Sequence, residues 1–123
     1  MDVNNNVEYF ETYFSGWPKD VIPHLKVSIG IFKRYYKFVK IGITSTPDSR
    51  FSQHKKRDKN FSWERMIVKY KTTSVANANA VEDYFISTDD SLVNIWTGYS
   101  HMTDNGPYHV YILLGNHKRR KRR

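Results

Sequence analysis

Alternating hydrophobic and polar positions predict two neighbouring β-strands in the first half of the chain. In the first run, residues 25–32, Val27, Ile29 and Ile31 would share one face, and a valine and two isoleucines do the same in residues 38–43. Residues 33–37 between them are polar enough for a hairpin loop, although they lack the Asn-Gly or Asp-Gly pair of the tightest turns. Gly30 and Gly42 would then lie opposite the apolar face and leave a groove that another backbone can approach closely.

A helix with a clear start follows the second strand. Ser45 or Thr46 can cap it, and Pro47 suits its first position, where a missing backbone N–H does no harm. Arg50 and His54 are four residues apart, so they lie one above the other on the same helix face.

A second capped helix carries a carboxylate next to its apolar face. Ser74 can cap a helix over residues 74–86, whose valine, alanine, phenylalanine and isoleucine residues form one hydrophobic side. Glu82 lies at the edge of that side. A carboxylate in this position is partly desolvated unless it is paired or holds a cation.

The flanking segments complete an α+β pattern. Residues 4–15 have aromatic side chains at helical spacing and predict an amphipathic helix, which would cover the sheet or pair two chains. Residues 64–72 alternate as a third strand, and residues 108–114 form a final apolar strand. We therefore expect a small mixed or antiparallel three-stranded sheet flanked by helices, with an added N-terminal helix and C-terminal strand.

The chain is short enough for one domain with a modest core. We expect a helical extension over residues 1–24, a main domain over residues 25–115 and a basic tail over residues 116–123 that is disordered when unbound. The tail has three interpretations: a phosphate-binding arm, a nuclear localisation signal or a merely solvated segment.

The net charge of +8 is unevenly distributed. Residues 33–71 hold twelve Lys and Arg against three acids, whereas residues 72–116 hold no Lys or Arg and five acids. Such clustering is typical of a nucleic-acid-binding surface, and a solvated basic face is the simpler alternative. The candidate nucleic-acid-binding residues are Lys33, Arg34, Lys37, Lys55, Lys56 and Arg57.

Composition also excludes several classes of protein and site. There is no cysteine, so disulfides and thiolate zinc sites are absent, and the spacing of His101, His109 and His117 fits no usual zinc site. No apolar run reaches the ~18 residues of a transmembrane helix, and the N-terminus lacks the basic start of a signal peptide. We expect an intracellular protein without membrane contact, nuclear in a eukaryotic host and cytoplasmic otherwise.

Over residues 25–95 the chain resembles the GIY-YIG nuclease superfamily. Gly30-Ile31-Phe32 would be its first motif and Lys40-Ile41-Gly42 its second, followed by an arginine-bearing helix, a metal-binding glutamate and a final asparagine motif. The corresponding residues here are Arg50, Glu82 and Leu92-Val93-Asn94. Phe32 replaces the tyrosine whose hydroxyl is implicated in activating water, and Tyr35 or Tyr36 would have to supply one from the loop.

The resemblance implies a small metal-dependent DNA endonuclease, and the small size and single-domain architecture suggest a stand-alone viral, phage or mobile-element product. Glu82 would hold Mg²⁺ or Mn²⁺, and Arg50 would clamp the phosphate through its two-pronged guanidinium group. His54 would contact the phosphate or pass a proton, and Lys40 would activate a neighbouring hydroxyl or water. Each of these residues also has a purely structural interpretation, as a paired or solvated side chain.

Two other functions remain open at this point. Phe32 in place of tyrosine favours a catalytically inactive nucleic-acid-binding module on the same fold. The aromatic helix at the N-terminus would suit a protein-interaction module. A symmetric double-strand cut with one active site per chain would require a homodimer.

Overall fold

The computed structural model describes residues 7–58, 60–89, 91–93 and 106–118, without the side chains of residues 10–14. Its centre is a four-stranded sheet in the order β1-β4-β5-β2, where β1 is Val7–Phe14, β2 is Phe38–Thr44, β4 is Arg65–Thr72 and β5 is Tyr108–Gly115. β1 runs parallel to β4, and the β4–β5 and β5–β2 pairs are antiparallel.

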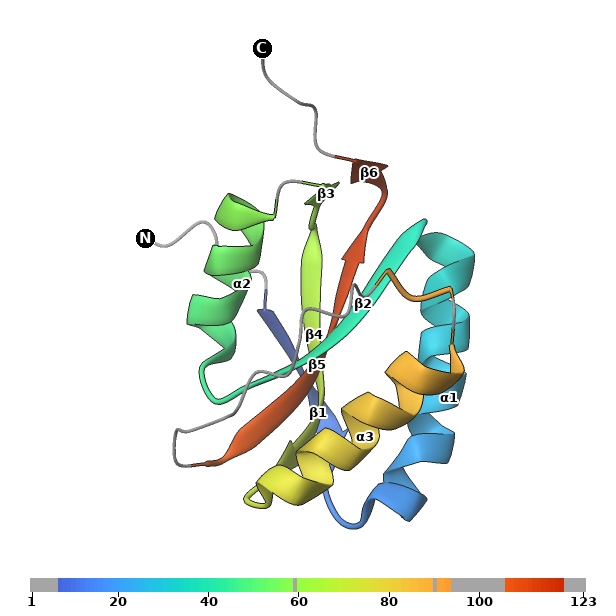
Figure 1. The fold of residues 1–123 in the computed structure, drawn as a ribbon, viewed down its shortest axis with the longest axis vertical. Coiled ribbons are helices and arrows are strands. Elements are labelled where there is room, and N and C mark those ends of the chain that lie inside the picture. Colours follow the sequence, from blue (N-terminus) through green and yellow to red (C-terminus); the bar gives the residue numbers. More distant parts are fainter. Residues whose placement is uncertain (1–6, 59, 90, 94–105, 119–123) are drawn as a thin grey trace.

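Helices cover both faces of this sheet. α1 (Pro18–Tyr35) and α3 (Val75–Thr88) lie on one face, and α2 (Pro47–Arg57) lies on the other (Figure 1). A separate two-stranded sheet pairs β3 (Phe61–Ser62) with β6 (His117–Lys118). The predicted α+β class is therefore confirmed.

Each face of the sheet has its own hydrophobic core. The larger core holds Val21, Leu25 and Ile29 of α1 together with buried residues of α3 and of all three antiparallel strands. The smaller core lies under α2, where Phe51 packs with a group from the sheet and the β3 region: Trp63, Met66, Val68, Tyr111 and Leu113. Because successive strand residues point to opposite faces, β5 supplies both cores and is buried along its whole length.

The predicted strand at residues 25–32 is wrong, because these residues form the second half of α1. Pro18 takes the first helical turn, and Val21, Leu25 and Ile29 recur every four residues and are buried. In a strand, Val27 and Ile31 would have pointed with Ile29 toward the protein core. In the helix they are exposed. The expected hairpin loop at residues 33–37 is also wrong, because residues 33–35 complete the helix and β2 pairs with β5 instead of with a preceding strand.

The predicted helix at residues 4–15 is also wrong over its described part. Residues Val7–Phe14 form β1, an edge strand aligned with β4 so that Val7 lies beside Met66 and Tyr9 beside Val68. Glu8 receives two hydrogen bonds from Arg65, at 2.6 Å each, which tie the two strands together. The protein-interaction hypothesis that relied on an aromatic N-terminal helix therefore lacks that helix.

The other predicted elements are confirmed. β2, α2, β4 and α3 appear within two residues of their expected limits, and the hydroxyl of Ser74 accepts a hydrogen bond from the N–H of Asn77 at the start of α3. The final strand also forms, but it lies inside the sheet between β4 and β2 instead of being added at an edge. Within the described ranges, we find no helix with the length and hydrophobicity needed to cross a lipid bilayer.

Gly42 is the glycine on which the geometry of the sheet depends most directly. It lies opposite Tyr111 in the β2–β5 pair, and a Cβ atom at this position would be only 2.3 Å from the Tyr111 hydroxyl oxygen. The groove predicted above Gly42 therefore exists, and the ring of Tyr111 fills it. Gly30 is different, because it lies on the exposed side of α1 and a Cβ there would meet nothing within 4 Å.

We expect Gly42→Ala to destabilise the protein by about 1–3 kcal/mol, since the buried Tyr111 ring must move to admit a methyl group. Gly30→Ala is the matched control and should stabilise the helix by about 0.5–1 kcal/mol. Urea unfolding of both variants measures the two effects. A Gly42→Ala protein as stable as wild type would contradict the packing of Tyr111 on Gly42.

Candidate active site

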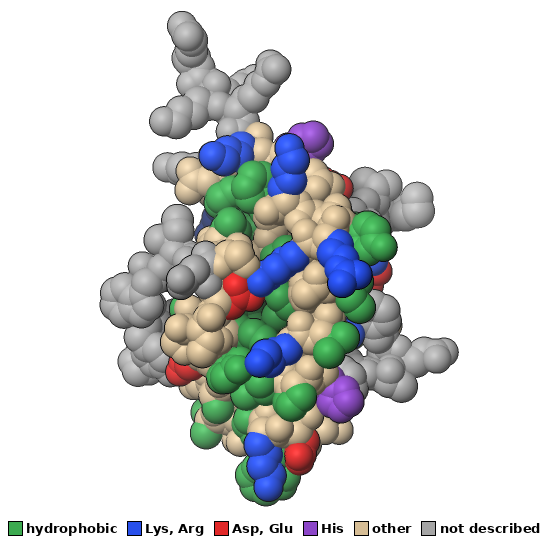
Figure 2. Space-filling model, turned by 90° about the vertical axis from the view of Figure 1, so that its right-hand side faces the viewer, with side chains coloured by type: hydrophobic (Ala, Val, Ile, Leu, Met, Phe, Trp, Pro, Cys, Tyr) green, Lys and Arg blue, Asp and Glu red, His purple; other side chains and the backbone are tan. Residues whose placement is uncertain are grey.

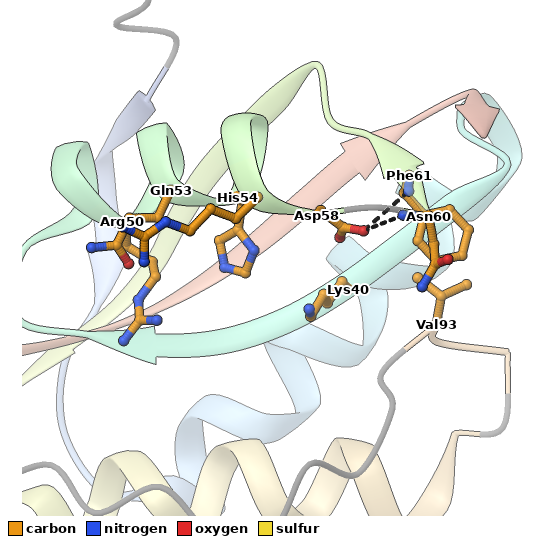
Figure 3. A pocket seen from close by; sticks show the side chains of 9 residues that line it. Lys40, Arg50, Gln53, His54, Asp58, Asn60, Phe61 and Val93 are labelled. Carbon is orange, nitrogen blue, oxygen red and sulfur yellow. Dashed lines mark hydrogen bonds between the residues drawn. The ribbon is translucent and has the colours of Figure 1, made fainter. Parts of the chain in front are cut away.

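A pocket of about 330 Å³ lies at the β2 edge of the sheet, beside α2. Lys40 of β2 and Arg50, Gln53, His54 and Arg57 of α2 form one part of its lining. The segment after the helix and one residue that follows α3 complete it, namely Asp58, Asn60, Phe61 and Val93 (Figure 3). Three of the predicted catalytic residues, Lys40, Arg50 and His54, therefore come together in one cavity.

α2 is held so that one of its sides faces this pocket. Phe51 and Pro47 are buried and fix the helix against the sheet. Arg50, His54 and Arg57 follow at spacings of four and three residues, which places them along one side of the helix. Figure 3 shows the side chains of Arg50 and His54 extending from α2 toward β2.

Asp58 organises the end of the pocket where α2 stops. One of its carboxylate oxygens accepts hydrogen bonds from the N–H groups of Asn60 and Phe61, at 2.9 and 3.1 Å, and the other accepts one from the Trp63 indole at 2.7 Å. Burial by itself would raise the pKa of Asp58, but the hydrogen bonds from Trp63 and the backbone outweigh it and lower the pKa. Asp58 is therefore an ionised group that fixes the chain beside the basic residues.

Tyr111 is the residue of this site that the sequence did not reveal. Its hydroxyl lies 2.8 Å from Nε2 of His54, and its ring lies over Gly42 and is only 3% exposed. The sequence showed residues 108–114 as a continuous apolar strand without a preferred face. The register of β5 against β2, with Tyr111 opposite Gly42, would have identified it.

The position of Tyr111 also changes the interpretation of the first motif. Gly30-Ile31-Phe32 lies in α1, not in a strand, so that assignment is wrong. Tyr36 is not among the residues that line the pocket, and its hydroxyl oxygen accepts a hydrogen bond from Arg65 at 2.7 Å. A tyrosine hydroxyl in contact with the second motif's glycine comes from Tyr111 instead.

Burial and neighbouring charges keep His54 neutral. Burial lowers its pKa to about 4, the positive charges of Lys40 and Arg50 contribute in the same direction, and Asp58 opposes them. Burial likewise lowers the pKa of Lys40, with Arg50 adding to the effect while Asp58 and Glu82 oppose it. Burial raises the pKa of the Tyr111 phenol, which stays protonated. The site thus holds a neutral imidazole next to a protonated phenol.

Glu82 approaches the same site from the opposite face of the sheet. It lies on α3, outside the residues that line the pocket, but its charge acts on the pKa values of both Lys40 and Tyr111. This is possible because β2 is the edge strand, so that residues of α2 and α3 can approach one another around it. Burial raises the pKa of Glu82 to about 7, with a further increase from Asp83, while Lys40 lowers it.

The site offers few side-chain ligands for a metal ion. No group of three or more His, Cys, Asp or Glu residues that could hold one occurs in the described part of the chain. Within that part, no side chain forms a hydrogen bond or ion pair with Glu82. One desolvated carboxylate fits a hard cation such as Mg²⁺ only if water and phosphate oxygens supply the other ligands.

The predicted nucleic-acid-binding residues do not form a single surface. Arg57 lines the pocket, and Lys55 and Lys56 lie on the same helix, with the Lys55 ammonium 5.1 Å from the Phe51 ring centroid. Lys33 lies elsewhere, paired with Asp89 between α1 and α3. Arg34 and Lys37 are exposed near the end of α1. Asn94 lies outside the described residues.

The raised pKa of Glu82 predicts a specific dependence of stability on pH. Between pH 4.5 and about 7 the folded protein binds more protons at Glu82 than the unfolded chain does, so this residue reduces stability as the pH rises. Glu82→Gln removes this loss, and its stability relative to wild type should increase from pH 5 to pH 8 by on the order of 1 kcal/mol.

Chemical unfolding of both proteins at the two pH values measures this difference. His54 acts in the opposite direction in both proteins, because its lowered pKa makes stability fall as the pH drops below 6.5, and the comparison cancels its effect. An unchanged difference between pH 5 and pH 8 would show that Glu82 titrates like an exposed carboxylate.

Comparison with known proteins agrees with a site of this kind. Residues 28–87, just under half of the chain, match the T5orf172 domain. That domain is phage-associated and linked to the GIY-YIG and HNH-like nuclease folds. No curated protein and no solved structure matches the chain. The matched segment contains Lys40, Arg50, His54 and Glu82, and the similarity suggests a nuclease-like or DNA-binding module.

Proposed function

We propose that this protein is a metal-dependent endonuclease that hydrolyses phosphodiester bonds of DNA at the β2 edge. The observation that carries the proposal is the hydrogen bond between His54 and Tyr111 beneath a pocket lined by Lys40, Arg50 and Arg57. A neutral base and several cations line one cavity, a buried phenol contacts the base, and such groups can support hydrolysis of a phosphate diester. The T5orf172 match supports the same class of function.

The cations of the pocket suit binding of a phosphate group. Arg50 and Arg57 can each offer two parallel N–H groups to phosphate oxygens, and Lys40 adds a point charge from the adjacent strand. Gln53 and Asn60 add amide groups to the same lining. A phosphodiester in this cavity would have its negative charge neutralised from both β2 and α2.

His54 is the residue best placed to take a proton from the attacking water. It lines the pocket and is neutral at physiological pH, whereas Tyr111 is almost wholly buried. A bound phosphate would offset the positive charges of Lys40 and Arg50 and so raise the pKa of His54 toward the range of an effective base. The Tyr111 hydroxyl orients the imidazole through their hydrogen bond and supplies the phenol that Phe32 does not.

Lys40 would protonate the leaving oxygen. Its pKa is lowered by burial, so its ammonium group is a better proton donor than an exposed lysine. In the reaction, the water oxygen forms a bond to phosphorus and its proton passes to His54. The bond to the leaving oxygen breaks, and that oxygen takes a proton from Lys40.

Glu82 is the residue that would hold Mg²⁺ or Mn²⁺. The bound ion would neutralise negative charge that develops on the phosphate. With Glu82 as a single carboxylate ligand, substrate oxygens and water complete the coordination, so affinity for the metal should be low until DNA binds.

We expect the wild-type protein to nick or linearise supercoiled plasmid in the presence of Mg²⁺ or Mn²⁺. Tyr111→Phe keeps the ring over Gly42 but removes the hydroxyl, and it should slow cleavage on the order of 10²-fold; His54→Ala and Glu82→Ala should cost about 10²–10⁴-fold. Agarose gel electrophoresis of plasmid forms over time measures the rates.

Tyr9→Phe is the matched control, since Tyr9 is an exposed tyrosine on β1. It should cleave as fast as wild type. Equal rates for wild type, Glu82→Ala and Tyr111→Phe would reject the proposed site and indicate a contaminating nuclease.

A nucleic-acid-binding module without catalysis is the second candidate. The near-complete burial of Tyr111 favours it, as does the engagement of Asp58, the carboxylate that lines the pocket, in three hydrogen bonds. In that case the wild-type protein would retard DNA in a gel without cutting it, and Arg50→Ala and Arg57→Ala would weaken the retardation. Cleavage that depends on Glu82 would exclude this candidate.

A further inference from the structure

The outward side of α1 carries hydrophobic residues that the rest of the described chain leaves uncovered. Val27, Ile31 and Tyr35 are 64%, 47% and 72% exposed. Their four-residue spacing places them along one ridge of the helix. Figure 2 faces this side of the molecule and shows hydrophobic side chains spread among Lys and Arg side chains. The exposed face of a helix in a monomeric protein is ordinarily polar, so this ridge needs an explanation.

Gly30 adds a second unusual feature beside the ridge. It lies within α1, it is exposed, and a Cβ atom there would meet nothing within 4 Å. Glycine inside a helix is less favourable than alanine, and no packing within the chain requires it here. A residue without a side chain lets a second helix approach the backbone closely.

One pair of opposite charges on α1 lies symmetrically about Val27, whereas the exposed Lys19 and Lys26 have no acidic residue at the symmetric position. Asp20 lies seven residues before Val27 and Arg34 lies seven residues after it, and seven residues correspond to about two helical turns. Both side chains are exposed, and within the described ranges neither forms a side-chain hydrogen bond or ion pair. Their positions also suit the helix dipole, but the dipole does not account for the hydrophobic ridge between them.

We propose that α1 is a dimerisation surface that binds the α1 helix of a second copy in the antiparallel direction, about a twofold axis at Val27. Each residue then faces the one equally far on the other side of Val27. Asp20 lies opposite Arg34 of the second copy, and Ile31 lies opposite Pro23 of the second copy. Gly30 lies opposite His24 of the second copy, where a larger residue would hold the helices apart.

Self-complementary charge is what favours a second copy over another partner. An isologous contact repeats every pair twice, so two Asp20–Arg34 pairs form from one surface. A parallel arrangement would instead place Asp20 against Asp20 and Arg34 against Arg34. No residue of α1 lines the pocket at the β2 edge, so the contact leaves that pocket open in both subunits.

The size of the contact sets the expected affinity. α1 has 18 residues, so it is about 27 Å long, and one pair of such helices buries less than a standard protein–protein interface. We therefore expect a dissociation constant in the micromolar range.

Sedimentation equilibrium over about 1–200 μM protein tests the proposal without reference to nuclease activity. The wild-type protein should dimerise, and Val27→Asp should raise the dissociation constant at least about tenfold, because a carboxylate would be buried at the axis. Gly30→Leu should weaken the dimer as well, although it should not destabilise the monomer, since space is open there.

A charge exchange tests the antiparallel direction. Asp20→Arg and Arg34→Asp should each weaken the dimer, and the double variant carrying both should restore it. Asp83→Arg reverses an exposed charge on α3 and should have no effect on the dissociation constant. Circular dichroism verifies that each variant is folded.

Three results would overturn the proposal. They are a wild-type protein that stays monomeric over the whole concentration range, a dimer that neither Val27→Asp nor Gly30→Leu weakens, and a double charge variant that fails to dimerise. Because sedimentation reports association alone, loss of the dimer and loss of cleavage would be separate findings.

Discussion

The antiparallel pairing of β5 with β2 is the interaction on which the site depends. It sets Tyr111 opposite Gly42, so the ring can lie flat on the neighbouring strand where any other residue would exclude it. The hydroxyl then meets His54 of α2, whose helix is held over the same face by Phe51. The consecutive elements β2 and α2 therefore meet the distant strand β5 through one cross-strand position without a side chain.

The electrostatics of the site follow from its place at a sheet edge. α2 and α3 lie on opposite faces of the sheet, but β2 has no neighbour on its outer side, so charges from both helices act on Lys40. Partial burial at this edge pushes each ionisable group toward its neutral form. It lowers the pKa values of His54 and Lys40 and raises those of Glu82 and Tyr111. A phosphate would enter a cavity whose polar groups are positioned but incompletely solvated.

The elements with local signals could be predicted from the sequence. Pro47 and Ser74 mark the starts of α2 and α3, and β2 and β4 show clear alternation, so the elements that carry Lys40, Arg50 and His54 were predicted correctly. Residues 25–32 were misassigned because their isoleucines and valine satisfy a period of two, whereas the helical pattern begins earlier, at Val21. The first buried residue of the helical pattern, Val21, lies before residue 25, so the pattern of residues 25–32 alone does not reveal the helix.

Long-range pairing accounts for the remaining differences. Residues 7–14 have helix-like spacing of aromatic residues, but they form a strand because β4 offers a parallel edge. Tyr111 could not be singled out within an unbroken apolar run, since strands buried on both faces show no alternation. Its importance depends on a partner 69 positions earlier in the chain, at Gly42. Local pattern thus defined α2, α3, β2 and β4, and tertiary contact decided which tyrosine belongs to the site.

The small β3–β6 sheet connects two segments that are far apart in the sequence at one wall of the pocket. Lys118 of β6 pairs with Phe61 of β3, and Phe61 lines the pocket. A displacement of β6 would therefore reach the pocket lining directly through β3, without passing through the central sheet.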